Sequence, residues 1–105
     1  MTREFFGDAE RDFTLTPDLI TELERKTGVG IGALCMKVFN GNFTLAEITE
    51  TIRLGMIGGG TQPAEADALT KTYIVTPSLT QSHALAVTIL DRLYSGAPKD
   101  PNAKA

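Results

Sequence analysis

The stretch FTLAEITETIRLGMIGGG, residues 43–60, decides the fold. Thr44 and Glu47 have the spacing of a capping box, in which the hydroxyl and the carboxylate each accept a hydrogen bond from a backbone N–H of the first turn. The glycines at 58–60 end the helix, because glycine readily adopts the left-handed conformation found at helix ends. We therefore predict a helix from Thr44 to about Ile57. Its inward face carries four apolar residues at helical spacing: Leu45, Ile48, Ile52 and Met56.

Two shorter helices are predicted before this one. Thr16-Pro17-Asp18 is a helix start, since the hydroxyl can cap free N–H groups, proline is tolerated at the first helical position and the acid lies near the positive end of the helix dipole. This first helix is expected to end at Gly28. The second, from about Gly30 to Phe39, carries one narrow apolar stripe.

The N-terminal stretch has the alternation of a strand. Phe13 and Leu15 alternate with polar neighbours, which is typical of a strand with one buried face. We expect a short β-hairpin that turns near Gly7–Glu10. It should pack against the helices, because an isolated two-stranded hairpin is marginal in water.

Two further helices complete the predicted fold. One begins near Pro63, and the last runs from about Pro77 to Tyr94 and is apolar around most of its circumference. The fold class is therefore mainly α (α+β), with a short N-terminal β-hairpin followed by about five helices. We expect one compact domain over residues 1–95 and a flexible polar tail over residues 96–105.

The charge pattern argues against nucleic acid and membrane partners. The 105-residue chain has a net charge of −3, and its ten Lys and Arg residues are spread along the whole length. Such a chain repels phosphate backbones and anionic headgroups. No apolar run approaches the roughly 20 residues of a membrane span or resembles the core of a signal peptide. We expect a cytoplasmic protein.

The side chains that could carry chemistry are isolated in the sequence. His83 is the only histidine and Cys35 the only cysteine, so a typical zinc site cannot form within one chain. The glycines at 28–32 follow a helix where a dinucleotide loop needs a strand. No Lys-Ser/Thr follows the glycines at 58–60 as a phosphate loop requires, although a hinge or a close approach by a partner's backbone is an alternative to simple helix termination. We expect no catalytic, cofactor-binding or metal-binding residue, no cofactor and no enzymatic activity.

Seven apolar residues are candidates for a partner-binding surface. They lie off the main apolar stripes, at helix ends or at the start of the hairpin: Phe5, Phe6, Leu54, Met56, Ile57, Leu93 and Tyr94. Exposed apolar area of this kind marks protein interaction sites. The alternative is that these side chains close the core, with the paired phenylalanines covering the last helix.

The order of these segments resembles the small tail-assembly-chaperone family found with gene transfer agents and related tailed phages of alphaproteobacteria. The resemblance spans about residues 3–96. It is carried by the stretch at 41–60, the segment AEADAL at 64–69 and the alanine-rich segment at 85–90, with a similar hairpin-to-helix junction at Leu15–Pro17.

The resemblance implies a non-enzymatic assembly factor of a prophage or gene transfer agent. Proteins of this family are thought to bind the tape-measure protein and the tail-tube protein during tail morphogenesis, and they offer no catalytic positions to transfer. Self-association is also expected, because many copies must act along one template. Two other interpretations stay open: a helical DNA-associated or regulatory module, and a small enzyme of unrecognised type.

Overall fold

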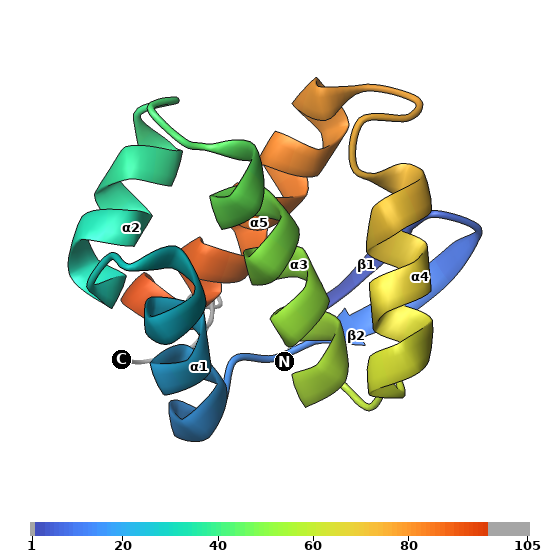
Figure 1. The fold of residues 1–105 in the computed structure, drawn as a ribbon, viewed down its shortest axis with the longest axis horizontal. Helices are drawn as coiled ribbons and strands as arrows, with labels where there is room; N and C mark the ends of the chain where they lie inside the picture. Colours follow the sequence, from blue (N-terminus) through green and yellow to red (C-terminus); the bar gives the residue numbers. More distant parts are fainter. Residues whose placement is uncertain (1, 97–105) are drawn as a thin grey trace, which may run out of the picture.

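The computed structural model describes residues 2–96, and it consists of one hairpin and five helices (Figure 1). In chain order the elements are β1 (Thr2–Phe6), β2 (Ala9–Phe13), α1 (Pro17–Thr27), α2 (Ile31–Phe39), α3 (Leu45–Gly58), α4 (Pro63–Tyr73) and α5 (Leu79–Ser95). The predicted fold class, a hairpin followed by about five helices in one compact globule, is confirmed. Apart from Gly96, the predicted polar tail lies outside the described residues.

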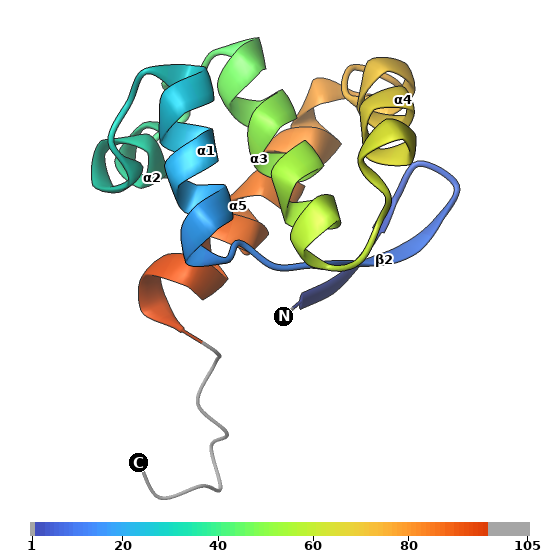
Figure 2. The same cartoon turned by 60° about the horizontal axis from the view of Figure 1, so that its bottom comes forward.

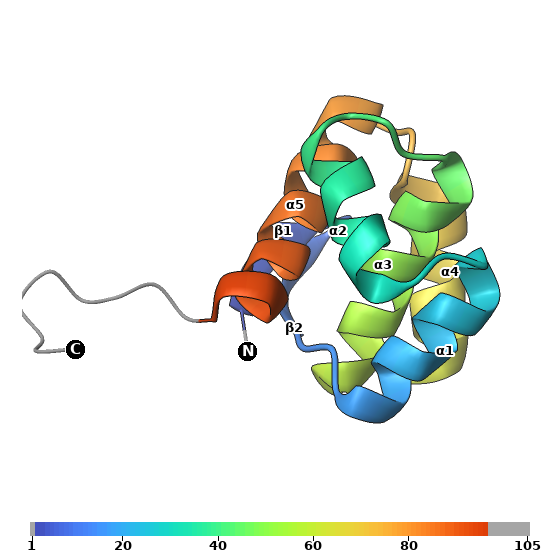
Figure 3. The same cartoon turned by 90° about the vertical axis from the view of Figure 1, so that its left-hand side faces the viewer.

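Helix α3 is the centre of the fold. It contacts α1, α4, α5 and β2. In Figures 1 and 3, α1, α3 and α4 form a front layer, while α5 and the hairpin lie behind it. Figure 2 shows α2 at the far end from the hairpin, where it packs on α5.

The predicted capping box of α3 is present and extends to a neighbouring helix. The Glu47 backbone N–H donates to the Thr44 hydroxyl at 3.2 Å, and the Thr44 N–H donates to the Glu47 carboxylate at 2.8 Å. Lys37 of α2 also donates to this carboxylate at 2.6 Å. Burial raises the pKa of Glu47, but these hydrogen bonds outweigh it and hold the pKa below its ordinary value. One residue thus both caps α3 and ties it to α2.

The inward face of α3 differs from the prediction at one position. Ile48, Ile52 and Met56 are completely buried, as predicted. Leu45 is 54% exposed, so the prediction was wrong there. The reason is that Leu45 lies in the first turn, at the rim of a groove between α3 and α4.

The hairpin is tighter than predicted. Its strands pair antiparallel from Thr2↔Phe13 to Phe6↔Ala9, so the turn holds only two residues and Gly7 has a φ of 73°. Strand β2 ends at Phe13, because the next backbone N–H, that of Thr14, donates to the Gly55 carbonyl of α3 at 2.9 Å. This bond docks the hairpin directly on the central helix.

The glycines that end α3 also allow a close backbone contact. A Cβ added at Gly58 would collide with the Thr14 carbonyl, and one at Gly59 would collide with the Asp12 carbonyl. The backbone that comes close belongs to this chain's own hairpin. Gly60 is different, because it has open space around it and a φ of 112°.

The last helix begins later than predicted, at Leu79. Ser78 caps it, with its hydroxyl accepting from the Gln81 N–H at 3.2 Å. None of the helices in the described part of the chain has the length and apolarity needed to span a bilayer.

Candidate interaction surfaces

The lone histidine, His83, is held by contacts to neighbouring segments of the fold. The His83 ring is half-buried, with Nε2 2.7 Å from the Val38 carbonyl oxygen. The ring also stacks on Phe43, with 4.5 Å between the ring centroids. These contacts tie α5 to the end of α2 and to the segment before α3.

The lone cysteine is packed in the core. Cys35 is fully buried, and this burial raises the pKa of its thiol. A thiol with a raised pKa is a poor nucleophile at neutral pH. Within residues 2–96, no group of three or more His, Cys, Asp or Glu side chains is placed to hold a metal ion.

The seven proposed partner-binding residues divide into three groups. Phe6, Leu54 and Met56 are buried in the core, so they offer no surface to a partner. Ile57 and Leu93 are partly buried and pack against the core. Only Phe5, at 65% exposed, and Tyr94, at 61%, are freely accessible. The proposal of a partner surface therefore passes to these two aromatic side chains.

Phe5 stands between two hollows formed by β1 and α5. The larger, of about 370 Å³, is called the hairpin hollow here; its lining residues are Glu4, Phe5, Gln81, Ala84, Leu85 and Thr88. The smaller, of about 150 Å³, lies on the side of Phe6 and Tyr73, whose rings meet edge to face at 6.2 Å. A side chain from a partner could enter either hollow beside the exposed Phe5 ring.

Tyr94 borders a separate apolar hollow at the end of α5. This hollow has a volume of about 230 Å³, and its lining residues are Ile20, Ile31, Gly32, Cys35, Leu93 and Tyr94. The Tyr94 ring also meets Phe39 edge to face, with 6.2 Å between centroids. The Phe5 and Tyr94 surfaces are therefore served by different ends of α5.

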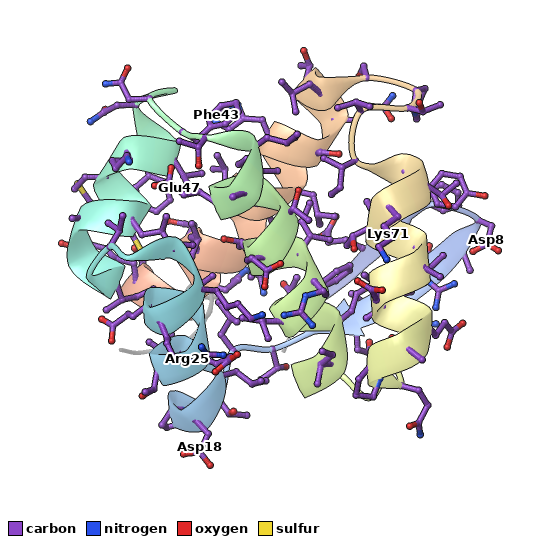
Figure 4. The ribbon with its side chains drawn as sticks, in the orientation of Figure 1. Asp8, Asp18, Arg25, Phe43, Glu47 and Lys71 are labelled. Atoms are coloured by element: carbon purple, nitrogen blue, oxygen red, sulfur yellow. The ribbon has the colours of Figure 1, made fainter. Side chains whose placement is uncertain are left out.

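Another groove, of about 380 Å³, runs between α3 and α4. None of the seven candidate residues chosen from the sequence lines it. Leu45 and Val75 line it, and Val75 is 58% exposed. Its charged residues are largely satisfied within the groove, because Lys71 lies 3.0 Å from Asp67 one turn earlier on α4 and Arg53 is paired with Glu50. Lys71 lies on the face of α4 that borders this groove (Figure 4).

The sequence contained an indication of exposed apolar surface at this α3–α4 groove. Val75 lies after the apolar stripe of α4 and directly before Thr76-Pro77, where a β-branched apolar residue has no helix face to serve. Met36 and Leu79 are likewise exposed, and both lie on the solvent side of otherwise apolar helices. Apolar side chains next to turn residues therefore indicate exposed apolar surface as well as those at helix ends do.

Comparison with known proteins gives one result. A family model described as "Phage tail tube protein, GTA-gp10" matches residues 2–96. No curated protein and no solved structure gives a significant match.

Proposed function

Because that match covers nearly the whole chain, the protein belongs to this family of phage and gene-transfer-agent tail proteins, and we propose that it is a tail assembly chaperone. A tail-related role, with other tail components as its partners, follows from the family. The finer proposal is that the chain binds the tape-measure protein and the tail-tube protein in the cytoplasm while the tail is built, without enzymatic activity and without becoming part of the particle.

The observation that carries the proposal is the dispersed arrangement of exposed apolar side chains. The large ones within residues 2–96 lie on different elements: Phe5, Met36, Leu45, Val75, Leu79 and Tyr94. Permanent assemblies bury continuous, hydrophobic interfaces of roughly 2,000–5,000 Å². Separate aromatic anchors beside small hollows are better suited to contacts that form and are released.

The alternative is a structural subunit of the tail tube, which the description of the family as tail tube proteins favours. The two functions differ in where the protein ends up. A tube subunit stays in the finished particle in many copies, whereas a chaperone leaves.

Two measurements test the proposal. The chain is co-expressed with the long helical tail protein and, separately, with the tube protein of its own gene cluster, and each is expected to yield a soluble complex. Quantitative mass spectrometry of purified particles should then find the tube protein in abundance and this chain at background. Abundant chain in washed particles would establish the structural alternative, and failure to co-purify with either protein over a range of salt would overturn the chaperone proposal.

A further inference from the structure

Outside the core, the hairpin hollow combines an apolar lining with the carboxylate of Glu4. We infer that it receives a lysine or arginine side chain from a tail protein that the chain binds. This inference rests on the proposed function, because it takes the occupant to be a segment of another protein rather than a small molecule.

The charge at the hollow comes from a carboxylate that makes no ion pair. Within residues 2–96, the Glu4 carboxylate has no side-chain hydrogen bond or salt bridge, although Arg11 lies opposite Glu4 in the hairpin register. The hairpin's own cations are engaged elsewhere, because Arg3 lies 3.0 Å from Asp12 and Arg11 lies 2.8 Å from Asp8. A partner that brings a cation to Glu4 therefore completes an ion pair without breaking one.

The apolar lining suits the stem of a long cationic side chain. Leu85 is buried beneath the hollow, Ala84 is exposed beside it and Phe5 forms its rim. Lysine and arginine lay their methylene groups on apolar surface while the charged end stays near water. The volume of about 370 Å³ is within the roughly 300–1,000 Å³ range of ligand sites and leaves room for such a side chain.

The surrounding charge favours a basic partner over a second copy of this chain. Thr88 lines the hollow, and Asp91, three residues further along α5, places a second carboxylate on the same face of that helix beyond the lining residues. A second copy carries the same net charge of −3 and would present its own carboxylates to this face. Complementary charge speeds association and excludes wrong partners. The occupant is therefore a basic, amphipathic segment of a different tail protein.

The test uses the full chain and a fluorescein-labelled helical peptide of leucine and lysine, with a peptide of leucine and glutamate as its counterpart. Fluorescence anisotropy is expected to show binding of the lysine peptide only. Glu4→Gln should weaken it about three- to fivefold, as expected for loss of a partly exposed ion pair, and Phe5→Ser should also weaken it. Circular dichroism checks that each variant is folded.

Asp18→Asn is the matched control. It removes one negative charge, as Glu4→Gln does, but Asp18 lies at the start of α1, across the molecule from the hairpin turn at Asp8 (Figure 4). Its affinity for the lysine peptide should stay within twofold of the wild type. Equal weakening by both substitutions would overturn the inference, because the attraction would then be a property of the overall charge.

Two further outcomes separate this inference from the proposed function. If the wild type co-purifies with a tail protein and Glu4→Arg co-purifies equally well, the hollow is not the docking site although the chaperone proposal stands. If the wild type self-associates in sedimentation and Glu4→Gln prevents it, the occupant is a second copy, which overturns the inference. Failure of the wild type to bind either tail protein counts against the proposed function itself.

Discussion

Replacing Gly58 with alanine should destabilise the protein strongly, because the hairpin backbone occupies the space of a side chain there. The added Cβ would collide with the Thr14 carbonyl and lie 2.9 Å from Leu19 Cδ1. A side chain can rotate away, but this carbonyl is part of the segment that joins the hairpin to α1. Overpacking typically costs 1–3 kcal/mol. We expect a value near the upper end, about 3 kcal/mol.

Such a loss is a large part of the total stability, which is typically about 5–15 kcal/mol for a domain. Since 1 kcal/mol shifts the Tm of a small domain by about 4–8 °C, Gly58→Ala should lower the Tm by roughly 12–24 °C. Guanidinium unfolding followed by circular dichroism gives the free energy of unfolding and the m-value. An unchanged m-value would show that the native state is destabilised and that the unfolded state is unaffected.

Two other glycines of helices give matched comparisons. Gly32 of α2 has nothing within 4 Å of an added Cβ, so Gly32→Ala should stabilise by roughly 0.5 kcal/mol through helix propensity. Gly55 is intermediate, because its Cβ would meet the Phe13 ring at 3.3 Å, where propensity gain and crowding nearly cancel. From the most stable variant to the least stable, the predicted order is Gly32→Ala, Gly55→Ala and Gly58→Ala. A Gly58→Ala variant as stable as the wild type would refute the reasoning, since the glycine would then serve only to end the helix.

The remaining predictions concern one buried acid, the histidine and an exposed aromatic. Glu47→Gln should cost about 1–2 kcal/mol at pH 7. The pKa of Glu47 is held below its ordinary value, so its charged form contributes stability above the unfolded-state pKa and this contribution is lost as the pH falls through the folded-state pKa. In urea unfolding, the difference in free energy of unfolding between wild type and variant should therefore narrow below about pH 4.3. A difference that persists at pH 2 would contradict this. His83→Ala should cost about 1–2 kcal/mol, and His83→Phe should recover part of it by keeping the stack on Phe43, whereas equal losses would show that the stack contributes nothing. Tyr94→Ser should change the free energy of unfolding by less than about 0.5 kcal/mol while weakening co-purification with a tail protein; a large stability loss would place this ring in the core instead.

Local signals in the sequence were sufficient for the helices. Thr16, Thr44 and Ser78 each cap the helix that follows, because a cap depends on residues within three positions of one another. The hairpin was predicted from the alternation around Phe13, and its turn was placed near Gly7–Glu10, but the length of the turn was not predicted, since this stretch offers several short turns. Pairing Phe6 with Ala9 selects the two-residue turn.

Contacts between distant segments were beyond reach of the sequence. The glycines at 58–60 predict a helix end wherever they occur, and nothing near them indicates that β2 passes alongside. The Thr14 N–H bond to the Gly55 carbonyl joins residues 41 positions apart in the chain by a single backbone contact. The tight packing at Gly58 follows from that bond, so it became visible only in three dimensions.

The candidates for a partner-binding surface were hard to choose from the sequence for a reason that lies in the topology. Leu54 falls outside the stripe of Ile48, Ile52 and Met56, and an off-stripe apolar residue is exposed only if the helix has a free face. Helix α3 has five neighbouring elements around it, so Leu54 is buried as well. Strand alternation, by contrast, requires Phe5 and Phe6 to face opposite ways, and one of the two is indeed exposed. Apart from Met36 of α2, the large exposed apolar side chains of residues 2–96 lie on the hairpin, at helix ends or in a turn, and the central helix contributes only Leu45 of its first turn.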